Sequence, residues 1–206
     1  MAQFFHIHPV NPQLRLIRQA AEIVRAGGVI AYPTDSSYAL GCRIGDRAAL
    51  ERIQTIRQTE HNHYFTLVCR DLSALGTYAR VDNHQFRLLK RATPGPFTFI
   101  LRASHETPRH LQHPKRKTIG IRVPDHAIVR ALLDELGEPI LSSTLILPGD
   151  ELPLNDADAI RDQLDRQLEL VIDGGPCSQE YTTVLDLTDA APVLLRQGKG
   201  DASAFL

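Results

Sequence analysis

Cysteine is scarce in this chain, tryptophan is absent, and no apolar run is long enough to span a membrane. The 206 residues include three cysteines, one methionine and no tryptophan. Cys42, Cys69 and Cys177 are odd in number and far apart, which excludes the paired disulfide framework of a small secreted protein. No apolar run approaches the roughly 18–20 residues that cross a bilayer, and the N-terminus does not resemble a signal peptide. We therefore expect a cytoplasmic protein with no membrane partner.

Several common motifs of nucleotide, metal and hydrolase chemistry are also missing. No Walker A, GxGxxG, HExxH, CxxC or GxSxG pattern occurs. The pairs His61-x-His63 and His110-x-x-His113 have no cysteine or carboxylate cluster at zinc spacing nearby, so we predict no protein-bound metal. Cys42 and Cys69 lie in apolar, strand-like segments where a thiol is usually inert, and a single catalytic cysteine stays open as an alternative.

The formal net charge of −1 hides an uneven distribution. Residues 80–122 contain ten lysines and arginines against two acids, a local charge of +8. Residues 148–190 contain eleven acids against two arginines, a local charge of −9. A basic stretch of this kind attracts phosphate, nucleotide or RNA, and a solvated basic face balanced by an acidic segment has the same pattern. Charge alone does not decide between them.

Helical and strand-like patterns alternate along the chain, and 206 residues without repeats or linkers predict one domain over residues 1–206. Apolar residues at helical spacing predict helices at 11–26, 47–57, 83–91, 128–136 and 156–168. Short apolar runs predict strands at 29–32, 65–69, 97–101, 118–123, 140–144, 170–172, 184–187 and 193–195. Several strands follow one another without a helix between them. We therefore expect an α+β fold, with helices packed on a mixed parallel and antiparallel sheet.

Hydroxyl groups and a carboxylate gather where the strand at 29–32 ends. Residues 32–42 read Tyr-Pro-Thr-Asp-Ser-Ser-Tyr-Ala-Leu-Gly-Cys. Loops at strand ends are where α/β sheets place ligands. The alternative is a local turn in which Thr34, Asp35 and Ser36 satisfy backbone donors, and the local chemistry alone favours that turn.

This segment resembles the Pro-Thr-(Asp/Glu)-Thr-x-Tyr-Gly-Leu-Gly signature of the YrdC/YciO family, the L-threonylcarbamoyl-AMP synthases and their relatives. The resemblance covers roughly residues 10 to 200 and continues in Pro-Gly-Pro-Phe-Thr (94–98), Thr-Ile-Gly-Ile-Arg-Val-Pro-Asp-His (118–126), Tyr-Thr-Thr-Val (181–184) and Leu-Arg-Gln-Gly (195–198). Each motif is short, but five in the right order are hard to obtain by chance. The resemblance implies a strongly twisted mixed sheet flanked by helices, with a basic concave cavity.

The resemblance also implies an activity. Members of this family join ATP, L-threonine and bicarbonate to give threonylcarbamoyl-AMP and pyrophosphate, and the product feeds a tRNA modification. ATP would be a substrate, with Mg²⁺ accompanying the nucleotide. By their places in the motifs, the residues that would hold threonine or bicarbonate are Thr34, Arg122 and Thr182. Those that would face the nucleotide are Arg57, Thr59, Thr118, Thr144 and Arg196. No catalytic residue is assigned.

Two motifs depart from the synthase pattern in a way that is typical of the YciO branch. The Lys-x-Arg pair of the synthases corresponds to Arg57 and Thr59, and their Ser-x-Asn pair corresponds to Thr144 and Ile146. The hydroxyl of Thr59 cannot reproduce the phosphate contact of a guanidinium, and the side chain of Ile146 cannot donate a hydrogen bond. The first hypothesis is therefore a synthase, or a weakened version of one.

The second hypothesis is a non-catalytic protein that binds tRNA or another double-stranded RNA with its basic cavity. The residues that would contact phosphates are Arg109, Lys115, Arg116 and Lys117. Aromatic residues that could stack on unpaired bases are few, with only Phe97 and Phe99 nearby, so duplex binding by shape and charge is favoured over sequence reading. A third hypothesis is a related enzyme whose altered pocket accepts another acyl or nucleotide substrate.

Overall fold

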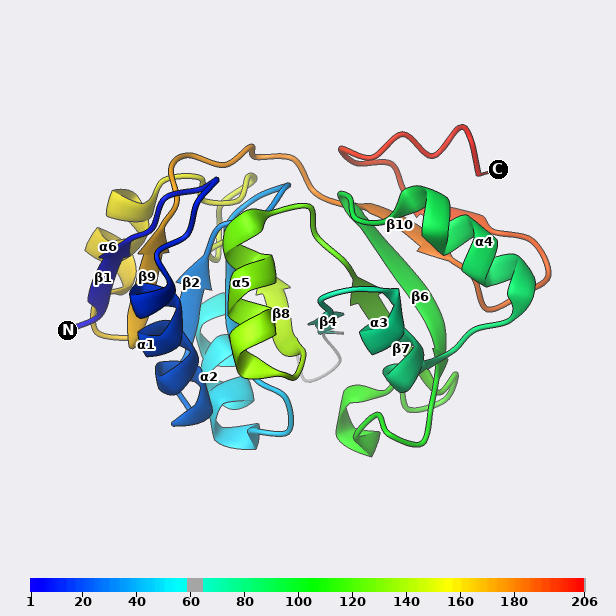
Figure 1. The fold of residues 1–206 in the computed structure, drawn as a ribbon, viewed down its shortest axis with the longest axis horizontal. Coiled ribbons are helices and arrows are strands. Elements are labelled where there is room, and N and C mark those ends of the chain that lie inside the picture. The colour runs from blue at the N-terminus through cyan, green and yellow to red at the C-terminus, as the bar shows by residue number, and fades with distance from the viewer. Residues whose placement is uncertain (59–64, 206) are drawn as a thin grey trace.

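The computed structural model describes residues 1–58 and 65–205. These residues fold around one extended sheet (Figure 1). Within these residues eleven strands share the sheet, in the order β1-β9-β2-β3-β8-β4-β7-β6-β10-β11, and β5 pairs with β6 beside this path. No helix in the described part of the chain has the length and apolar character needed to cross a bilayer.

The strands are β1 (Gln3–His6), β2 (Ile30–Tyr32), β3 (Ala39–Arg43), β4 (Thr66–Val68), β5 (Ala79–Arg80), β6 (Phe97–Ala103), β7 (Thr118–Arg122), β8 (Ile140–Thr144), β9 (Leu170–Asp173), β10 (Thr183–Asp186) and β11 (Val193–Arg196). The helices are α1 (Leu14–Arg25), α2 (Arg47–Arg57), α3 (Leu72–Tyr78), α4 (Asn83–Ala92), α5 (Ala127–Leu136) and α6 (Ala157–Leu164), with a 3₁₀ turn η1 (Arg109–Leu111).

The sheet is mixed, which confirms the predicted α+β fold. Parallel pairing joins β1 to β9, β2 to β9, β4 to β7 and β6 to β10. The pairs β2–β3, β3–β8, β4–β8, β5–β6, β6–β7 and β10–β11 are antiparallel. Antiparallel neighbours such as β2 and β3 are joined by a short connection, whereas parallel neighbours need a long crossover.

Successive strand residues contribute to two different apolar clusters. In β2, Ile30 and Tyr32 belong to the cluster that includes α1 and α5, whereas Ala31 belongs to the cluster that includes α2 and α6. Figure 1 shows α1 and α5 side by side in front of one half of the sheet, with α3 and α4 over the other half. Because side chains alternate between the faces of a strand, burial of both faces produces the continuous apolar runs seen in the sequence.

The predicted element boundaries hold best where a pattern is bounded by clear signals. Residues 47–57 and 140–144 form a helix and a strand at the predicted positions. The first helix begins at Leu14 rather than at position 11, because Gln13 takes the cap position. The helix predicted for 156–168 ends at Leu164, and the chain then turns toward β9.

The strand β3 and the helix α3 are among the elements that were not predicted. The first four residues of β3, 39–42, are small or apolar and all buried, so no two-residue alternation shows in its sequence. Gly41 is required there, because a Cβ at this position would lie 2.7 Å from the Tyr32 ring. The helix α3 is short and contains Gly76, and the Asp71 carboxylate caps it by accepting a hydrogen bond from the Ala74 N–H at 2.8 Å.

Candidate functional site

Polar side chains from both halves of the sheet converge on a cavity of about 250 Å³. The cavity is lined by Ser37, Ala39, Arg57, Phe65, Thr66, Thr98, Ile100, Gly120, Arg122, Ser142, Ser143, Thr144, Tyr181, Thr182, Val184 and Arg196. Gly120 lies in the middle of β7, and its lack of a side chain lets the cavity reach the backbone between Thr66 and Thr98. Three arginines and no carboxylate belong to this lining, so the cavity is basic.

The first cation, Arg122, ends β7 and is held by the turn that follows β2. Its guanidinium forms a buried ion pair with Asp35, and Nη1 donates to the Ser36 hydroxyl at 3.4 Å. The other Asp35 oxygen accepts a hydrogen bond from the Asp125 N–H at 2.8 Å. Both side chains of the ion pair are only 9% exposed. A buried charge requires this kind of compensation, so the pair fixes the position of Arg122 in the cavity wall.

The second cation, Arg57, is the last residue of α2. Its Nη1 donates to the Ser143 hydroxyl, and no acid in the described part of the chain pairs with it. Burial lowers the pKa of the Arg57 guanidinium, which nevertheless remains charged at neutral pH. Among the described residues, the Nε groups of Arg57 and Arg122 are both buried and lack a hydrogen-bond acceptor. These two N–H groups are therefore unsatisfied donors within the described residues.

The third cation, Arg196, ends β11 and lies against Tyr181. Its Cζ is 4.8 Å from the centre of the Tyr181 ring. Its Nε donates to the main-chain oxygen of Thr182 at 3.0 Å, and its Nη2 donates to the Thr182 hydroxyl at 3.2 Å. The Thr182 hydroxyl is also 2.8 Å from that of Thr98 on the neighbouring strand β6. Desolvation lowers the pKa of Arg196, and no acid among the described residues forms an ion pair with it.

The hydroxyls of β8 differ in what they offer to a ligand. Ser142 donates to the Leu40 carbonyl at 3.1 Å and accepts from the Tyr32 hydroxyl at 2.6 Å. Because the single Ser142 proton is directed at the Leu40 carbonyl, the Tyr32 hydroxyl is the donor of this pair, and burial raises its pKa to about 12. Ser143 accepts from Arg57, and Thr144 is half-buried at the end of the strand. The β8 hydroxyls thus line the same side of the cavity as Arg57.

The structure brings together five of the eight residues predicted to hold threonine, bicarbonate or the nucleotide. These five are Arg57, Arg122, Thr144, Thr182 and Arg196. Thr118 is buried on the same face of β7 as Gly120 and Arg122, but outside the cavity lining. Thr59 lies outside the described residues. Ile146, at the position of the synthase asparagine, is half-buried and does not line the cavity.

Thr34 is buried and does not belong to the cavity lining. It is 4% exposed, and its hydroxyl donates to the Ser37 carbonyl at 2.6 Å. The same oxygen accepts from the Ser36 N–H at 3.2 Å. This is the local turn that the sequence offered as an alternative, and its contact with threonine or bicarbonate stays a prediction. The turn places Ser37 in the cavity lining instead.

The residues predicted to bind RNA form a separate, exposed surface. Arg109, Lys115, Arg116 and Lys117 are all exposed and precede β7, at the end of the strand away from Arg122. They do not line the cavity, which corrects the expectation that the RNA contacts use it. Arg116 pairs with the buried carboxylate of Asp186 at 2.7 Å. Within the described part of the chain, the other three form no ion pair.

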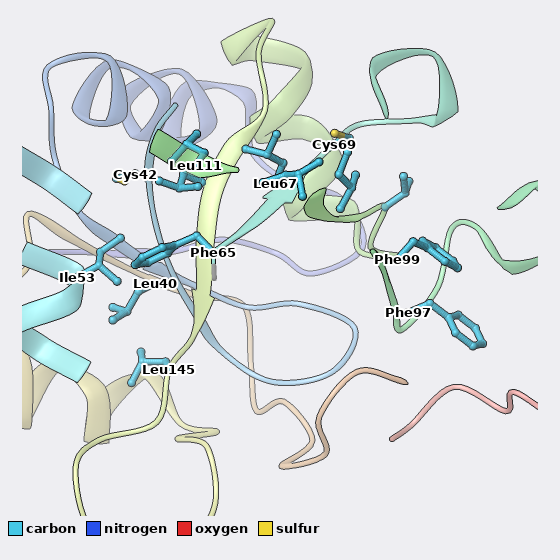
Figure 2. Packing of buried hydrophobic residues seen from close by; sticks show 14 of the residues in the cluster. Leu40, Cys42, Ile53, Phe65, Leu67, Cys69, Phe97, Phe99, Leu111 and Leu145 are labelled. Atoms are coloured by element: carbon cyan, nitrogen blue, oxygen red, sulfur yellow. The ribbon is translucent and has the colours of Figure 1, made fainter. Parts of the chain in front are cut away.

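The two phenylalanines considered for base stacking belong to the core. Phe97 and Phe99 are 7% and 0% exposed, with ring centres 6.0 Å apart, and Figure 2 shows them among the buried side chains. Neither ring is available to a base. Tyr181 is the half-buried aromatic residue of the cavity, and the sequence reasoning did not single it out as a site residue. Tyr181 could have been found from the sequence, because it directly precedes Thr182 in the motif 181–184, where the resembled family has an acid.

The described residues contain no group of three or more histidine, cysteine, aspartate or glutamate side chains placed to hold a metal ion. The cysteines are protonated at neutral pH. Burial raises the pKa of the Cys42 and Cys69 thiols to about 12 and that of Cys177 to about 11. The Cys177 thiol donates to the main-chain oxygen of Thr34 at 3.5 Å. The arrangement therefore offers arginines and hydroxyls for an anionic ligand, and no thiolate nucleophile.

Comparison with known proteins shows likeness over most of the chain. The Sua5/yciO/yrdC family model, described as "Telomere recombination", matches residues 22–198. The YciO protein of Escherichia coli (strain K12) is 59% identical over 206 residues, with both chains fully covered, and its crystal structure has a TM-score of 0.96 to this one. A threonylcarbamoyl-AMP synthase of Vibrio vulnificus is 31% identical over 186 residues, which are 88% of this chain and 98% of that protein.

A third likeness is to a solved complex. The crystal structure of P. abyssi Sua5 complexed with L-threonine is 28% identical, with a TM-score of 0.86, and the match covers 95% of this chain and 57% of that one. The residues matched by the family model include every residue that lines the cavity.

Proposed function

The chain belongs to the Sua5/YciO/YrdC family, and from that membership we propose that it binds ATP and L-threonine in the cavity and forms threonylcarbamoyl-AMP. The relatives of this family include threonylcarbamoyl-AMP synthases, and a related structure contains L-threonine. The observation that carries the proposal is the set of three arginines, from α2, β7 and β11, around one cavity.

The charge balance of the cavity supports an anionic ligand. Asp35 neutralises Arg122, whereas Arg57 and Arg196 have no acid partner within the described residues. A partly desolvated guanidinium without a counter-ion is costly, and an anion that pairs with it removes that cost. Phosphate is the anion that several guanidiniums recognise best, because their planar donors match its oxygens. The nucleotide phosphates therefore belong beside Arg57, in our proposal.

The threonine substrate belongs at the other side, near Arg122. The Arg122 Nε is buried without an acceptor, and Ser37 lies beside it in the lining. A substrate carboxylate would accept a charge-assisted hydrogen bond from this guanidinium. Asp35 holds the guanidinium rigidly, so the donor is positioned before the substrate arrives.

The chemistry then consists of two bond-forming steps. The threonine amino nitrogen attacks the bicarbonate carbon and water leaves, which gives a carbamate. A carbamate oxygen attacks the α-phosphorus of ATP, the bond from that phosphorus to the bridging oxygen breaks, and pyrophosphate leaves. Arg57 would stabilise the charge that develops on the transferring group. We expect Mg²⁺ to enter with the nucleotide, held by its phosphate oxygens.

The test is turnover by the full chain with ATP, L-threonine, bicarbonate and Mg²⁺, followed by pyrophosphate release and by mass spectrometry of the adenylate. We expect pyrophosphate release that requires both threonine and bicarbonate. Arg122→Ala should lower kcat/KM for threonine about 10- to 100-fold, as expected for loss of a charge-assisted hydrogen bond. Arg122→Lys keeps a cation beside Asp35 if the alanine variant does not fold.

Arg18→Ala is the matched control, because Arg18 is an exposed arginine on α1. It should turn over like the unmodified chain. A correctly folded chain that releases no threonine-dependent pyrophosphate contradicts the synthase proposal.

A second candidate function is binding of double-stranded RNA by the exposed loop before β7. The observation that favours it is the group Arg109, Lys115 and Lys117, which are exposed and form no ion pair within the described residues. Phosphate contacts release counter-ions, so affinity for an RNA duplex should fall steeply as salt rises. Replacing these three residues with alanine should weaken RNA binding and leave turnover unchanged. A salt-independent affinity contradicts this candidate.

A further inference from the structure

A second, larger cavity lies among the helices rather than in the candidate site. It is bordered by the beginning of α3, the end of α4, the middle of α5 and the residue that follows β7, and its volume is about 640 Å³. Figure 1 shows α3, α4 and α5 in front of the sheet, where its two halves meet. A volume of this size is typical of small-ligand sites. We call this cavity the helix-side groove.

The helix-side groove is separate from the candidate site. Among the described residues, none lines both cavities, although the consecutive residues Arg122 and Val123 line one each. The Arg122 carbonyl accepts from the Cys69 N–H, and the Val123 carbonyl accepts from the Gly95 N–H, both at 2.9 Å. A ligand in the groove therefore leaves the candidate site free.

The surface inside the groove is mainly apolar. Leu72 is half-buried at the start of α3, Val123 is 4% exposed, and Pro94 is exposed beside them. Thr93 adds little polarity, because its hydroxyl donates to the Leu89 carbonyl at 2.8 Å. An apolar surface of this kind gains free energy when an apolar ligand displaces its water.

The polar side chains of the groove leave one cation without a partner. The Arg70 guanidinium pairs with both carboxylates of the lining, through Nε to Asp71 at 2.9 Å and through Nη1 to Asp134 at 3.1 Å. Lys90, in the last turn of α4, also lines the groove. Its ammonium forms no ion pair or hydrogen bond with the residues that the structure describes.

The charge of the lining indicates which ligands fit. Three cations, Arg70, Lys90 and Arg130, face two carboxylates, so the lining carries a net charge of +1. A single negative charge balances it, and the Lys90 ammonium binds an anion as a point charge without a demand on geometry. The several charges of a nucleotide polyphosphate would instead be repelled by the carboxylates of Asp71 and Asp134.

We propose that the helix-side groove binds an organic monoanion with an apolar body, such as a carboxylate on a hydrocarbon chain or ring. The apolar body covers Leu72, Pro94 and Val123, and the anionic group lies at the Lys90 ammonium. This site is distinct from the candidate site, and it does not depend on the proposed synthase activity.

The experiment compares a charged and an uncharged probe of nearly the same shape. Fluorescence titration of the folded full chain measures the Kd of 1-anilinonaphthalene-8-sulfonate, a monoanion, and of N-phenyl-1-naphthylamine, which lacks the charge. We expect Lys90→Gln to weaken sulfonate binding about 5- to 10-fold and amine binding less than about twofold, as for loss of one charge-assisted contact. Lys90→Arg should bind both like the unmodified chain. Ser73→Trp, which places a ring at the groove, should weaken both.

A matched control and two competitors complete the test. Lys115→Gln removes an exposed lysine outside the groove and should change neither Kd. Octanoate should displace the sulfonate from the unmodified chain, and ATP should not. Equal sulfonate affinity in Lys90→Gln and the unmodified chain overturns the proposal, as does an equal loss in Lys115→Gln or displacement by ATP. Failure of octanoate to compete contradicts a carboxylate ligand.

The place of the probe is checked by amide chemical shifts. Octanoate should shift the amides of residues 70–73, 90–94 and 130–134, which border the groove. Shifts centred on residues 142–144 and 181–184 would place it in the candidate site and overturn the proposal.

Discussion

The ammonium group of Lys199 donates a hydrogen bond to the main-chain carbonyl of Asp35 at 2.7 Å, across 164 positions of sequence. The N–H of the same lysine donates to the carbonyl of Tyr181 at 2.9 Å. Lys199 therefore connects the turn that holds Arg122 to the wall that carries Tyr181. Asp35 is fixed through its backbone by Lys199 and through its carboxylate by Arg122 and the Asp125 N–H.

Replacing Lys199 should loosen the turn and weaken threonine binding. In Lys199→Met we expect faster hydrogen exchange of the amides in residues 34–37 and a KM for threonine raised about 3- to 10-fold, as for loss of one exposed hydrogen bond. Since the lysine does not line the cavity, kcat should stay within about twofold. Lys199→Arg should restore both values. Exchange that is identical in Lys199→Met and the unmodified chain would show that the hydrogen bond does not stabilise the turn.

Replacing Thr59 and Ile146, two positions that differ from the synthase motifs, by the synthase residues should raise turnover. Thr59→Arg adds a guanidinium and Ile146→Asn adds an amide donor; since Ile146 does not line the cavity, this variant tests whether the motif position acts on the phosphates all the same. Each new transition-state contact lowers the barrier, and about 1.4 kcal/mol corresponds to a tenfold gain in kcat. We therefore expect the double variant to exceed the unmodified chain about tenfold or more in pyrophosphate release. Ile146→Leu is the control and should not change the rate. A double variant that binds ATP and gains nothing contradicts this assignment of the positions.

The Arg116–Asp186 ion pair should make stability depend on acid pH. Burial raises the pKa of Asp186. Hydrogen bonds from Thr188 and the contact with Arg116 lower this pKa by a larger amount, so the net shift is downward. A lowered folded-state pKa stabilises the fold fully above the ordinary aspartate pKa, about 3.9, and that contribution disappears as the pH falls through the folded-state value.

Chemical denaturation of Asp186→Asn between pH 7 and pH 2 measures this contribution. At pH 7 the variant should lose about 1–2 kcal/mol of unfolding free energy, and the gap to the unmodified chain should be constant down to about pH 5 and close below about pH 4. Asp162→Asn, at an exposed position on α6, should follow the unmodified chain throughout. A gap that does not change with pH would contradict the role of the carboxylate charge.

The cysteines should be unreactive in the folded protein. Cys42 and Cys69 are fully buried with pKa values raised to about 12, and Cys177 has one of about 11. The thiolate is the reactive form, so iodoacetamide at pH 8 should label none of the three without denaturant and all three in urea, as measured by mass spectrometry. Turnover should survive the same treatment. Rapid labelling of Cys177 together with loss of turnover would reopen the alternative of a catalytic cysteine.

Much of the fold could be predicted because the signals are local. The helix at 47–57 has apolar residues at helical spacing, and the strand at 140–144 is a short run bounded by Pro139 and a polar loop. The strand β3 and the helix α3 were not predicted, because their sequences carry no clear local pattern. Small residues such as Gly41 are selected there by close tertiary contact with the Tyr32 ring, and this leaves no periodic pattern in the sequence.

The candidate site was predictable in part, through its motifs rather than through charge. The basic stretch 80–122 suggested the phosphate site, yet of the three arginines in the cavity lining only Arg122 comes from it. The other two arginines, Arg57 and Arg196, come from segments far from it. Most of the basic stretch instead contributes exposed residues such as Lys115 and Lys117. Net charge over a run of sequence does not tell which side chains share a surface.

The sequence by itself determined the fold class, the alternation of helices and strands, and the family motifs, because each depends on neighbours within a few residues or on short ordered segments. The tertiary structure alone decided which of these residues meet. The sheet order brings β7, β8, β10 and β11 to one cavity, leaves Thr34 buried outside its lining, and places Phe97 and Phe99 in the core. Strand pairing creates these contacts, in some cases between residues more than a hundred positions apart, and no local sequence pattern encodes them.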